Sequence, residues 1–134
     1  MKKLKGFTII ELLIVVVIIG VLTSIAIPNF YRLVHKARAA SVISNMHTTQ
    51  VTVELMASES GTIVYFPNIE GFVSELPRNF KNPYSKGNAI QNEDEENIEG
   101  VVEYEGDETY YKITGYANKT DSTLLELTPA THSF

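Results

Sequence analysis

A long run of apolar positions near the start of the chain dominates its hydropathy pattern. Five residues between Phe7 and Ile27 are neither aliphatic nor aromatic, and these are Thr8, Glu11, Gly20, Thr23 and Ser24. A helix needs about 20 predominantly apolar residues to cross the hydrocarbon core of a bilayer. The pattern therefore predicts a membrane-spanning helix over residues 7–27.

The helical pattern continues beyond this apolar run. Residues 29–58 contain no glycine or proline, and Gly61 is a suitable stop signal. Pro28 lacks a backbone N–H, so we expect a kink or a local loosening of the helix there. A helix from Phe7 to Ser58 would be roughly 75 to 80 Å long at 1.5 Å per residue.

The outer half of this helix, residues 28–60, has two apolar faces instead of one. One face carries Phe30, Val34, Ala37, Val51 and Leu55, and the nearly opposite face carries Val42, Met46, Val53 and Met56. Two faces indicate two partners, the chain's own globular part and neighbouring helices. A drift of the helical phase over many turns would give the same pattern, and the sequence leaves both explanations open.

The sequence pattern of residues 61–134 predicts a small globular head. A short helix is predicted over residues 68–76, with Asn68 as its N-cap, and a long loop over residues 79–97. Three strands are predicted by β-prone segments separated by turns at residues 105–108 and 118–121, and these segments are 101–104, 109–116 and 124–128. The predicted fold class is α+β, a long N-terminal helix packed against a small antiparallel sheet.

Charge is segregated along the chain, whose net charge is −5. Lys2, Lys3 and Lys5 precede the apolar run, and Arg32, Lys36 and Arg38 follow it as a basic juxtamembrane cluster. Acidic residues gather at 93–108, a surface that repels nucleic acid, so no nucleic-acid partner is predicted.

Neither cofactor nor catalytic chemistry is predicted. The chain has no cysteine, its three histidines (His35, His47 and His132) are far apart, and no phosphate-binding loop or nucleophile elbow is present. The acidic segment 93–99 is a weaker candidate for calcium, because oxygen ligands on a loop suit that ion. A solvated acidic face explains the same residues, and a membrane-tethered enzyme is disfavoured.

The segment before the apolar run points to proteolytic processing. A secretory signal peptide has its cleavage site after the apolar stretch, but here the small residue Gly6 lies before it. Cleavage between Gly6 and Phe7 would remove the leader 1–6 and keep the apolar helix. The lysines of the leader place it in the cytoplasm and the head on the other side of the membrane.

Residues 6–22, GFTIIELLIVVVIIGVL, resemble the leader-peptidase motif of type IV pilins and their relatives, and IAIPNF at 25–30 is similar to the family pattern. The resemblance implies that a prepilin peptidase cuts after Gly6 and N-methylates Phe7. It also implies a pilin fold, although the C-terminal disulfide of many pilin heads is absent. Assembly would then need an inner-membrane platform and an ATPase.

Glu11 is a lone carboxylate within the apolar helix, a costly placement that usually has a functional reason. Cleavage would create a cation nearby, the α-amine of Phe7. Glu11 is one helical turn away and can pair with this amine in its own chain or in a neighbour. The resemblance implies the second pairing, with Glu11 and Pro28 as assembly residues.

The predicted function is that of a structural subunit of a type IV pilus, a homopolymer held together by residues 7–27. The precursor would be a single-pass inner-membrane protein in contact with lipid, and the product an extracellular filament. Motility, adhesion and DNA uptake stay open as outputs. The alternative is a major pseudopilin of type II secretion, forming a periplasmic pseudopilus, because the segment 76–84 resembles the Asn-Pro-Tyr turn of those proteins.

Overall fold

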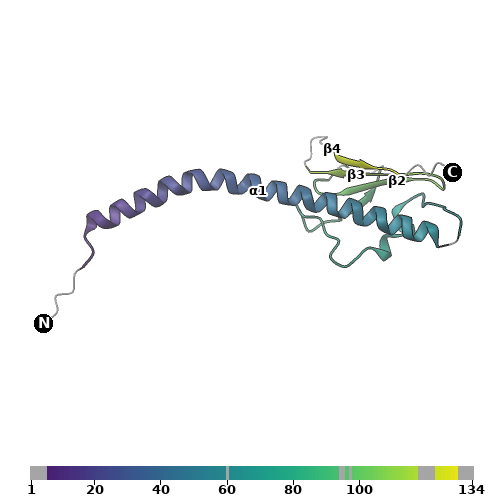
Figure 1. Ribbon diagram of the computed structural model, residues 1–134, viewed down its shortest axis with the longest axis horizontal. Coiled ribbons are helices and arrows are strands. Elements are labelled where there is room, and N and C mark those ends of the chain that lie inside the picture. Colours follow the sequence, from purple (N-terminus) through teal and green to yellow (C-terminus); the bar gives the residue numbers. More distant parts are fainter. Residues whose placement is uncertain (1–5, 60, 94–95, 97, 118–122, 130–134) are drawn as a thin grey trace. The chain divides into compact units, whose positions relative to one another are not determined.

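The computed structural model describes residues 6–59, 61–93, 96, 98–117 and 123–129. One long helix, α1 (Ile9–Ser58), is followed by two short 3₁₀ helices, η1 (Ile69–Gly71) and η2 (Val73–Glu75). Four strands complete the fold, and they are β1 (Ile90–Asn92), β2 (Val102–Gly106), β3 (Tyr111–Tyr116) and β4 (Thr123–Leu127). The chain divides into two compact units, residues 1–36 and 37–134, each described here by itself (Figure 1).

The start and the end of α1 each have an identifiable local cause. The helix begins at Ile9, two residues later than predicted, because Thr8 occupies the N-cap position. It ends at Ser58, as predicted. Gly61 then takes a positive φ of 76°, and its N–H donates to the Ser58 carbonyl at 3.2 Å. Glycine adopts this left-handed conformation without steric penalty, so it is a favourable residue just beyond a helix.

The helix α1 continues through Pro28 without a break. The missing N–H of Pro28 removes one bond of the helical ladder. The carbonyl that loses its donor is that of Ser24, four residues earlier. The side chain of Asn29, the residue after Pro28, donates to the next carbonyl, that of Ile25, at 3.3 Å.

The sheet has the order β1-β2-β3-β4. Strands β2, β3 and β4 form the predicted antiparallel meander, with Tyr104 opposite Ile113 and Ile113 opposite Leu127. The prediction of three strands was incomplete, because β1 lies within the predicted loop 79–97 and pairs with β2 in parallel. Three residues are too few for a period-two pattern to stand out from a turn-rich segment.

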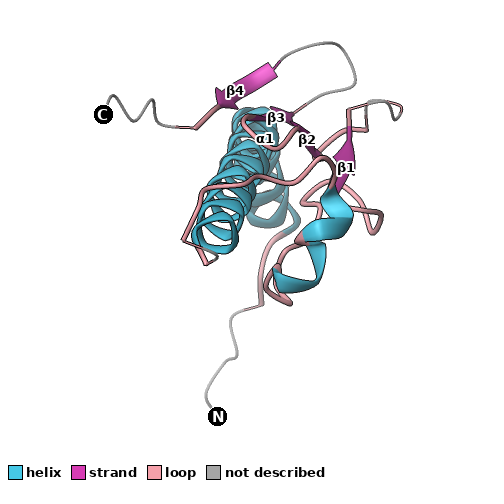
Figure 2. Ribbon diagram, turned by 90° about the vertical axis from the view of Figure 1, so that its right-hand side faces the viewer, coloured by secondary structure: helices cyan, strands magenta, loops and turns pink. Residues whose placement is uncertain are grey.

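The core of the second unit lies between the sheet and the α1 residues from Ala37 onward (Figure 2). The helix contributes Val42, Met46, Val53 and Ala57, all buried. Gly115 of β3 allows this close approach, because a Cβ there would lie 2.4 Å from the Met46 sulfur. The sheet supplies most of the aromatic packing, and Tyr104 and Tyr111 are fully buried.

The predicted short helix over residues 68–76 forms two 3₁₀ turns instead of one α-helix. Asn68 occupies the N-cap position of η1, but its side chain makes no capping bond, contrary to the prediction. The cap comes from β1, where Asn92 Oδ1 accepts the Ile69 N–H at 3.0 Å. A residue 23 positions away thus performs the function assigned to Asn68, which a local sequence rule does not detect.

Candidate processing and assembly site

The predicted cleavage site lies in non-helical chain directly before α1. Gly6 and Phe7 are both exposed, and the Phe7 side chain is 86% exposed. Proteases act most readily on exposed segments outside regular structure. The Gly6–Phe7 bond therefore has the accessibility that processing requires, while the rest of the leader, residues 1–5, lies outside the described residues.

Thr8 and Glu11 cap the helix reciprocally. Glu11 Oε2 accepts the Thr8 backbone N–H at 2.8 Å and the Thr8 hydroxyl at 2.9 Å, while Thr8 Oγ1 accepts the Glu11 N–H at 3.2 Å. This arrangement is a capping box, in which two otherwise unpaired N–H groups are satisfied at once. The Thr-x-x-Glu spacing of a capping box is visible in the sequence. The sequence-based interpretation of Glu11 as a pairing residue alone missed this capping role.

The capping box changes how Glu11 can act. Both bonds that the Glu11 carboxylate accepts from Thr8 use Oε2, so the carboxylate is already anchored at its own helix start. Its second oxygen, Oε1, receives no bond from Thr8. Because a carboxylate accepts several hydrogen bonds, an amine can bind at Oε1 without dismantling the cap. The predicted pairing with a neighbour's Phe7 amine is thus compatible with the cap and stays a prediction.

None of the residues that the structure describes covers the apolar segment. An 18-residue window of α1 has a mean hydropathy of 2.9, and none of it is buried. Residues such as Ile14, Ile18 and Ile25 are more than half exposed. Apolar surface on this scale needs an environment other than water, and the helix is long and apolar enough to cross a membrane.

The two apolar faces of the outer helix differ in burial. Val42, Met46 and Val53 face the chain's own sheet and are fully buried. Val51 and Leu55, on the other face, are 57% and 63% exposed. The structure thus identifies the partner of the first face as the head and leaves the second face uncovered in the single chain.

A polar cluster fixes the last turns of α1 to the sheet. The Tyr111 hydroxyl donates to Glu54 Oε1 at 2.7 Å and accepts from Gln50 Nε2 at 3.1 Å. The Tyr65 hydroxyl approaches Glu54 Oε2 at 3.4 Å. Burial, together with the neighbouring Glu54 carboxylate, raises the pKa of Tyr111 above its ordinary value. Burial also raises the pKa of Tyr65, so both tyrosines stay protonated as donors. These long-range contacts have no local sequence signal.

The Asn-Pro-Tyr segment is organised around the buried side chain of Asn82. Its Nδ2 donates to the carbonyls of Asn88 at 3.2 Å and Glu99 at 2.9 Å. Its Oδ1 accepts the N–H groups of Tyr84 at 2.8 Å and Ser85 at 3.1 Å. One amide thereby uses both donors and both lone pairs to join three separate segments.

Gly100 belongs to the same turn. Its φ is +83°, and a Cβ at this position would lie 2.3 Å from Asn82 Oδ1. Any other residue would meet both backbone strain and a steric clash. Sequence reasoning assigned no importance to Gly100.

Glu103 and Gln91 form a buried polar pair across β1 and β2. The two residues are register partners and are 7% and 1% exposed. Glu103 Oε2 and Gln91 Oε1 find no hydrogen-bond partner among the residues that the structure describes. Burial is the main reason why the pKa of Glu103 is raised, while the Tyr116 hydroxyl, which hydrogen-bonds to the carboxylate, opposes this shift.

The acidic candidate site for calcium is only partly described, because residues 94, 95 and 97 lie outside the described set. Among the described residues, no three His, Cys, Asp or Glu side chains come together in a way that could hold a metal ion. His35 and His47 belong to different units, and His132 lies outside the described residues. Calcium binding by this loop stays a prediction.

Comparison with known proteins finds a family motif at the N-terminus and similarity to several fimbrial and pilin proteins. The family model described as the prokaryotic N-terminal methylation motif matches residues 1–27. The fimbrial protein EcpB of Eikenella corrodens is 37% identical over 78 residues, covering 58% of this chain and 49% of that protein. No solved structure matches the chain significantly.

Two further relatives are also subunits of type IV pili or fimbriae by name. The type IV major pilin protein PilA of Myxococcus xanthus is 38% identical over 71 residues, covering 53% of this chain and 32% of that protein. The type IV major fimbrial protein FimA of Dichelobacter nodosus is 45% identical over 65 residues, covering 46% and 42%. The chain spans about half or less of the length of these relatives. Their names describe filament subunits, in agreement with the prediction of a structural protein and not an enzyme.

Proposed function

We propose that this chain, which is similar to type IV pilins in its N-terminal methylation motif and over part of its length, is a structural subunit of a type IV pilus. The precursor is inserted in the inner membrane through residues 7–27, trimmed after Gly6 and N-methylated on Phe7. The mature chains then polymerise into an extracellular filament.

A single observation carries this proposal. The unburied apolar helix, with a mean hydropathy of 2.9 over 18 residues, directly follows an exposed and non-helical Gly6–Phe7 bond. Bilayer hydrocarbon and the centre of a helical bundle are both apolar environments that suit this surface. Transfer from one to the other leaves the same side chains out of water, so one helix serves insertion and assembly.

The partners follow from this sequence of events. A prepilin peptidase cleaves and methylates the chain on the cytoplasmic face, and other copies of the chain form the filament. Extraction of the helix from the bilayer needs an inner-membrane assembly platform with its ATPase. Membrane lipid is the partner before assembly, and no metal or other cofactor is required.

Substitution at Gly6 tests the proposal. In cells that contain a prepilin peptidase, we expect the mass of the wild-type chain to correspond to residues 7–134 plus one methyl group. Electron microscopy should show filaments that contain this chain. Gly6→Val should keep the leader and abolish filaments. Gly20→Val is the matched control, because it makes the same substitution within α1, away from the cleavage site. An added Cβ at Gly20 meets nothing within 4 Å, so this variant should be cleaved normally. An intact Met1 leader in assembled filaments would refute the processing step.

A second candidate, the major pseudopilin of type II secretion, is supported by the Asn82 turn, whose amide makes four hydrogen bonds. In that case the chain would form a short periplasmic pseudopilus that drives protein export. Deletion of the gene would then abolish secretion of exported enzymes and leave surface filaments unchanged. Loss of surface filaments with normal secretion would exclude this candidate.

A further inference from the structure

Three basic side chains meet at one corner of the second unit. Arg38 projects from α1, and its guanidinium carbon lies 5.4 Å from the centroid of the Tyr84 ring. Lys81 and Lys86 belong to the following loop, where they line the same 330 Å³ hollow. We call Arg38, Lys81 and Lys86 the basic corner.

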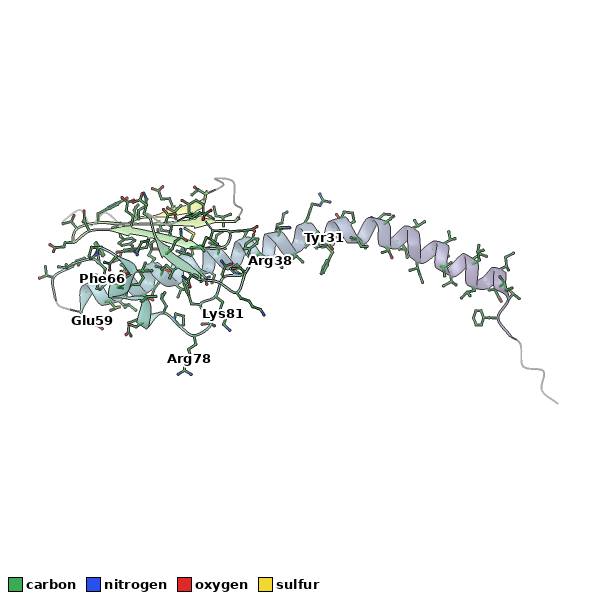
Figure 3. All side chains as sticks on the ribbon, turned by 180° about the vertical axis from the view of Figure 1, so that it is seen from behind. Tyr31, Arg38, Glu59, Phe66, Arg78 and Lys81 are labelled. Atoms are coloured by element: carbon green, nitrogen blue, oxygen red, sulfur yellow. The ribbon has the colours of Figure 1, made fainter. Side chains whose placement is uncertain are left out.

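The basic corner is held in place by the helix. Asn45, two turns after Arg38, donates through Nδ2 to the Lys81 carbonyl at 3.0 Å. The Asn82 side chain then fixes the next turn through Tyr84 and Ser85. In Figure 3, Arg38 and Lys81 lie at one end of the second unit, and Glu59 and Phe66 lie at the other. The corner is therefore at the end where α1 enters this unit.

The charges of the basic corner are available for an external partner. All three side chains are exposed. Within the described part of the chain, the ion pairs are those of Lys112 with Glu93 and Glu105, on the sheet. Glu99 is close enough to affect the pKa of Tyr84, so one carboxylate also faces this corner. Among the described residues, three cations against this carboxylate leave the corner positively charged.

Chain length places the basic corner near the bilayer surface. Arg38 lies eleven positions after Ile27, and α1 is continuous between them. As helix, eleven residues rise by about 16 Å. The headgroup layer on each side of a bilayer takes up about 5–7 Å of this distance. Arg38 is thus about one Debye length from the headgroups at physiological salt, even if the helix stands upright, and a tilted helix brings it closer.

We propose that the basic corner binds the phosphate headgroups of anionic phospholipids and holds the globular unit against the bilayer before assembly. This inference rests on the proposed membrane-inserted precursor. Anionic lipids attract basic residues near their surface, and Arg32 and Lys36, which precede the corner in the chain, add to the same charge. The contact gives the head a preferred orientation toward the membrane, and it must be released when the subunit enters the filament.

The test uses the full chain in lipid nanodiscs, with hydrogen exchange of the backbone amides as the readout. In discs that contain phosphatidylglycerol, we expect exchange of residues 78–87 to be slower than in pure phosphatidylcholine discs. The expected factor is about fivefold for each basic residue that contacts the surface. High salt should remove the difference, because exposed charges are screened.

A double variant and a matched control make the test specific. Lys81→Gln with Lys86→Gln should abolish the slowing, while exchange in β2 and β3 stays unchanged because both lysines are exposed. Lys112→Gln removes a positive charge from the sheet, outside the corner, and should leave the slowing intact. Equal exchange in the two kinds of disc, or a double variant that behaves like the wild type, would overturn the proposal.

Additional arms separate lipid from other anions. Phosphatidylcholine discs are supplied with inorganic phosphate or with a short DNA duplex. If DNA protects residues 78–87 and phosphatidylglycerol does not, the corner is a nucleic-acid surface and the lipid proposal is wrong. If free phosphate alone reproduces the effect, the corner is an anion site without a membrane function. Protection that occurs only with phosphatidylglycerol supports the proposal.

The same experiment distinguishes the two levels of inference. Amides of residues 9–27 should be protected in every disc if the helix spans the bilayer. If residues 9–27 are protected but exchange of residues 78–87 does not depend on lipid charge, the proposed membrane-inserted precursor is supported. The proposed contact of the basic corner with anionic lipid is then wrong. If residues 9–27 exchange freely, both proposals fail together.

Discussion

Glu11 shows how one side chain can satisfy a helix start and still be available to a neighbour. Its Oε2 atom accepts two bonds from Thr8, which completes a capping box. A carboxylate with a local partner is less costly in an apolar environment than a free one. The cap therefore helps to explain why a charge is tolerated here, and the remaining oxygen is free to select a positively charged partner.

Substitution of Glu11 separates capping from charge pairing. Glutamine at this position still completes a capping box but carries no charge, whereas leucine loses both. Loss of one partner from a buried charge pair costs about 2–5 kcal/mol, so Glu11→Gln should lower filament yield at least about tenfold. Glu11→Leu should reduce it similarly, with membrane insertion of both variants intact. Sheared filaments quantified by immunoblot provide the measurement, and normal yield from Glu11→Gln would assign Glu11 to capping alone.

At the level of elements, the head depends on contacts between segments that are remote in the sequence. Asn82 connects its own turn to the carbonyls of Asn88 and Glu99, and Tyr111 connects β3 to the end of α1 through Glu54. Such buried polar groups are costly when unpaired. In the described parts of the loop, residues 76–93 and 98–100, these bonds add to the little regular structure that the three-residue strand β1 supplies.

Removal of the Asn82 amide should destabilise the head. Asn82→Ala leaves two carbonyls and two N–H groups without their partner, and a single unsatisfied buried group costs about 1–3 kcal/mol. We expect a loss of at least about 2 kcal/mol in the free energy of unfolding. Urea denaturation of the detergent-solubilised chain, followed by near-ultraviolet circular dichroism of the seven tyrosines, measures this change. Asn79→Ala changes an exposed residue of the same loop and should have little effect. Equal midpoints for the two variants would contradict the assignment.

At the level of the whole molecule, apolar surface is divided between two tasks. The second unit buries its own apolar residues, including Val42, Met46 and Ile113. The first unit buries none of its apolar window. A chain of this kind is incomplete alone, because its N-terminal helix needs lipid or other copies to be removed from water. The same division explains why global stability of the head can be studied separately from assembly.

The pH dependence of head stability should reveal Glu103. Burial raises the pKa of this carboxyl in the folded chain, so between its unfolded and folded pKa values the native state binds more protons than the unfolded state. By linkage, this group's contribution to stability is fully present below the unfolded pKa. It is lost as pH rises through the folded pKa. Glu103→Gln should therefore be more stable than the wild type at neutral pH, and this advantage should shrink toward acidic pH.

Urea midpoints measured from acidic to neutral pH check this expectation. Glu70→Gln, which neutralises an exposed carboxylate, serves as the charge-matched control and should follow the wild type. A stability difference between Glu103→Gln and the wild type that is constant with pH would show that Glu103 titrates normally.

The N-terminal half was predictable because its signals are local. The apolar run and the helix end at Ser58 depend on neighbouring residues, and the meander of β2, β3 and β4 follows from alternating patterns. Several features were decided by tertiary structure, since their partners are distant in the chain: the pairing of β1 with β2, the cap that Asn92 gives to η1, and the choice of which apolar face of α1 is buried. Local patterns report what a segment can form, whereas burial and long-range hydrogen bonds select the partner. A polar group pays for a missing partner only once folding has buried it, and which apolar surfaces leave water together depends on the whole fold.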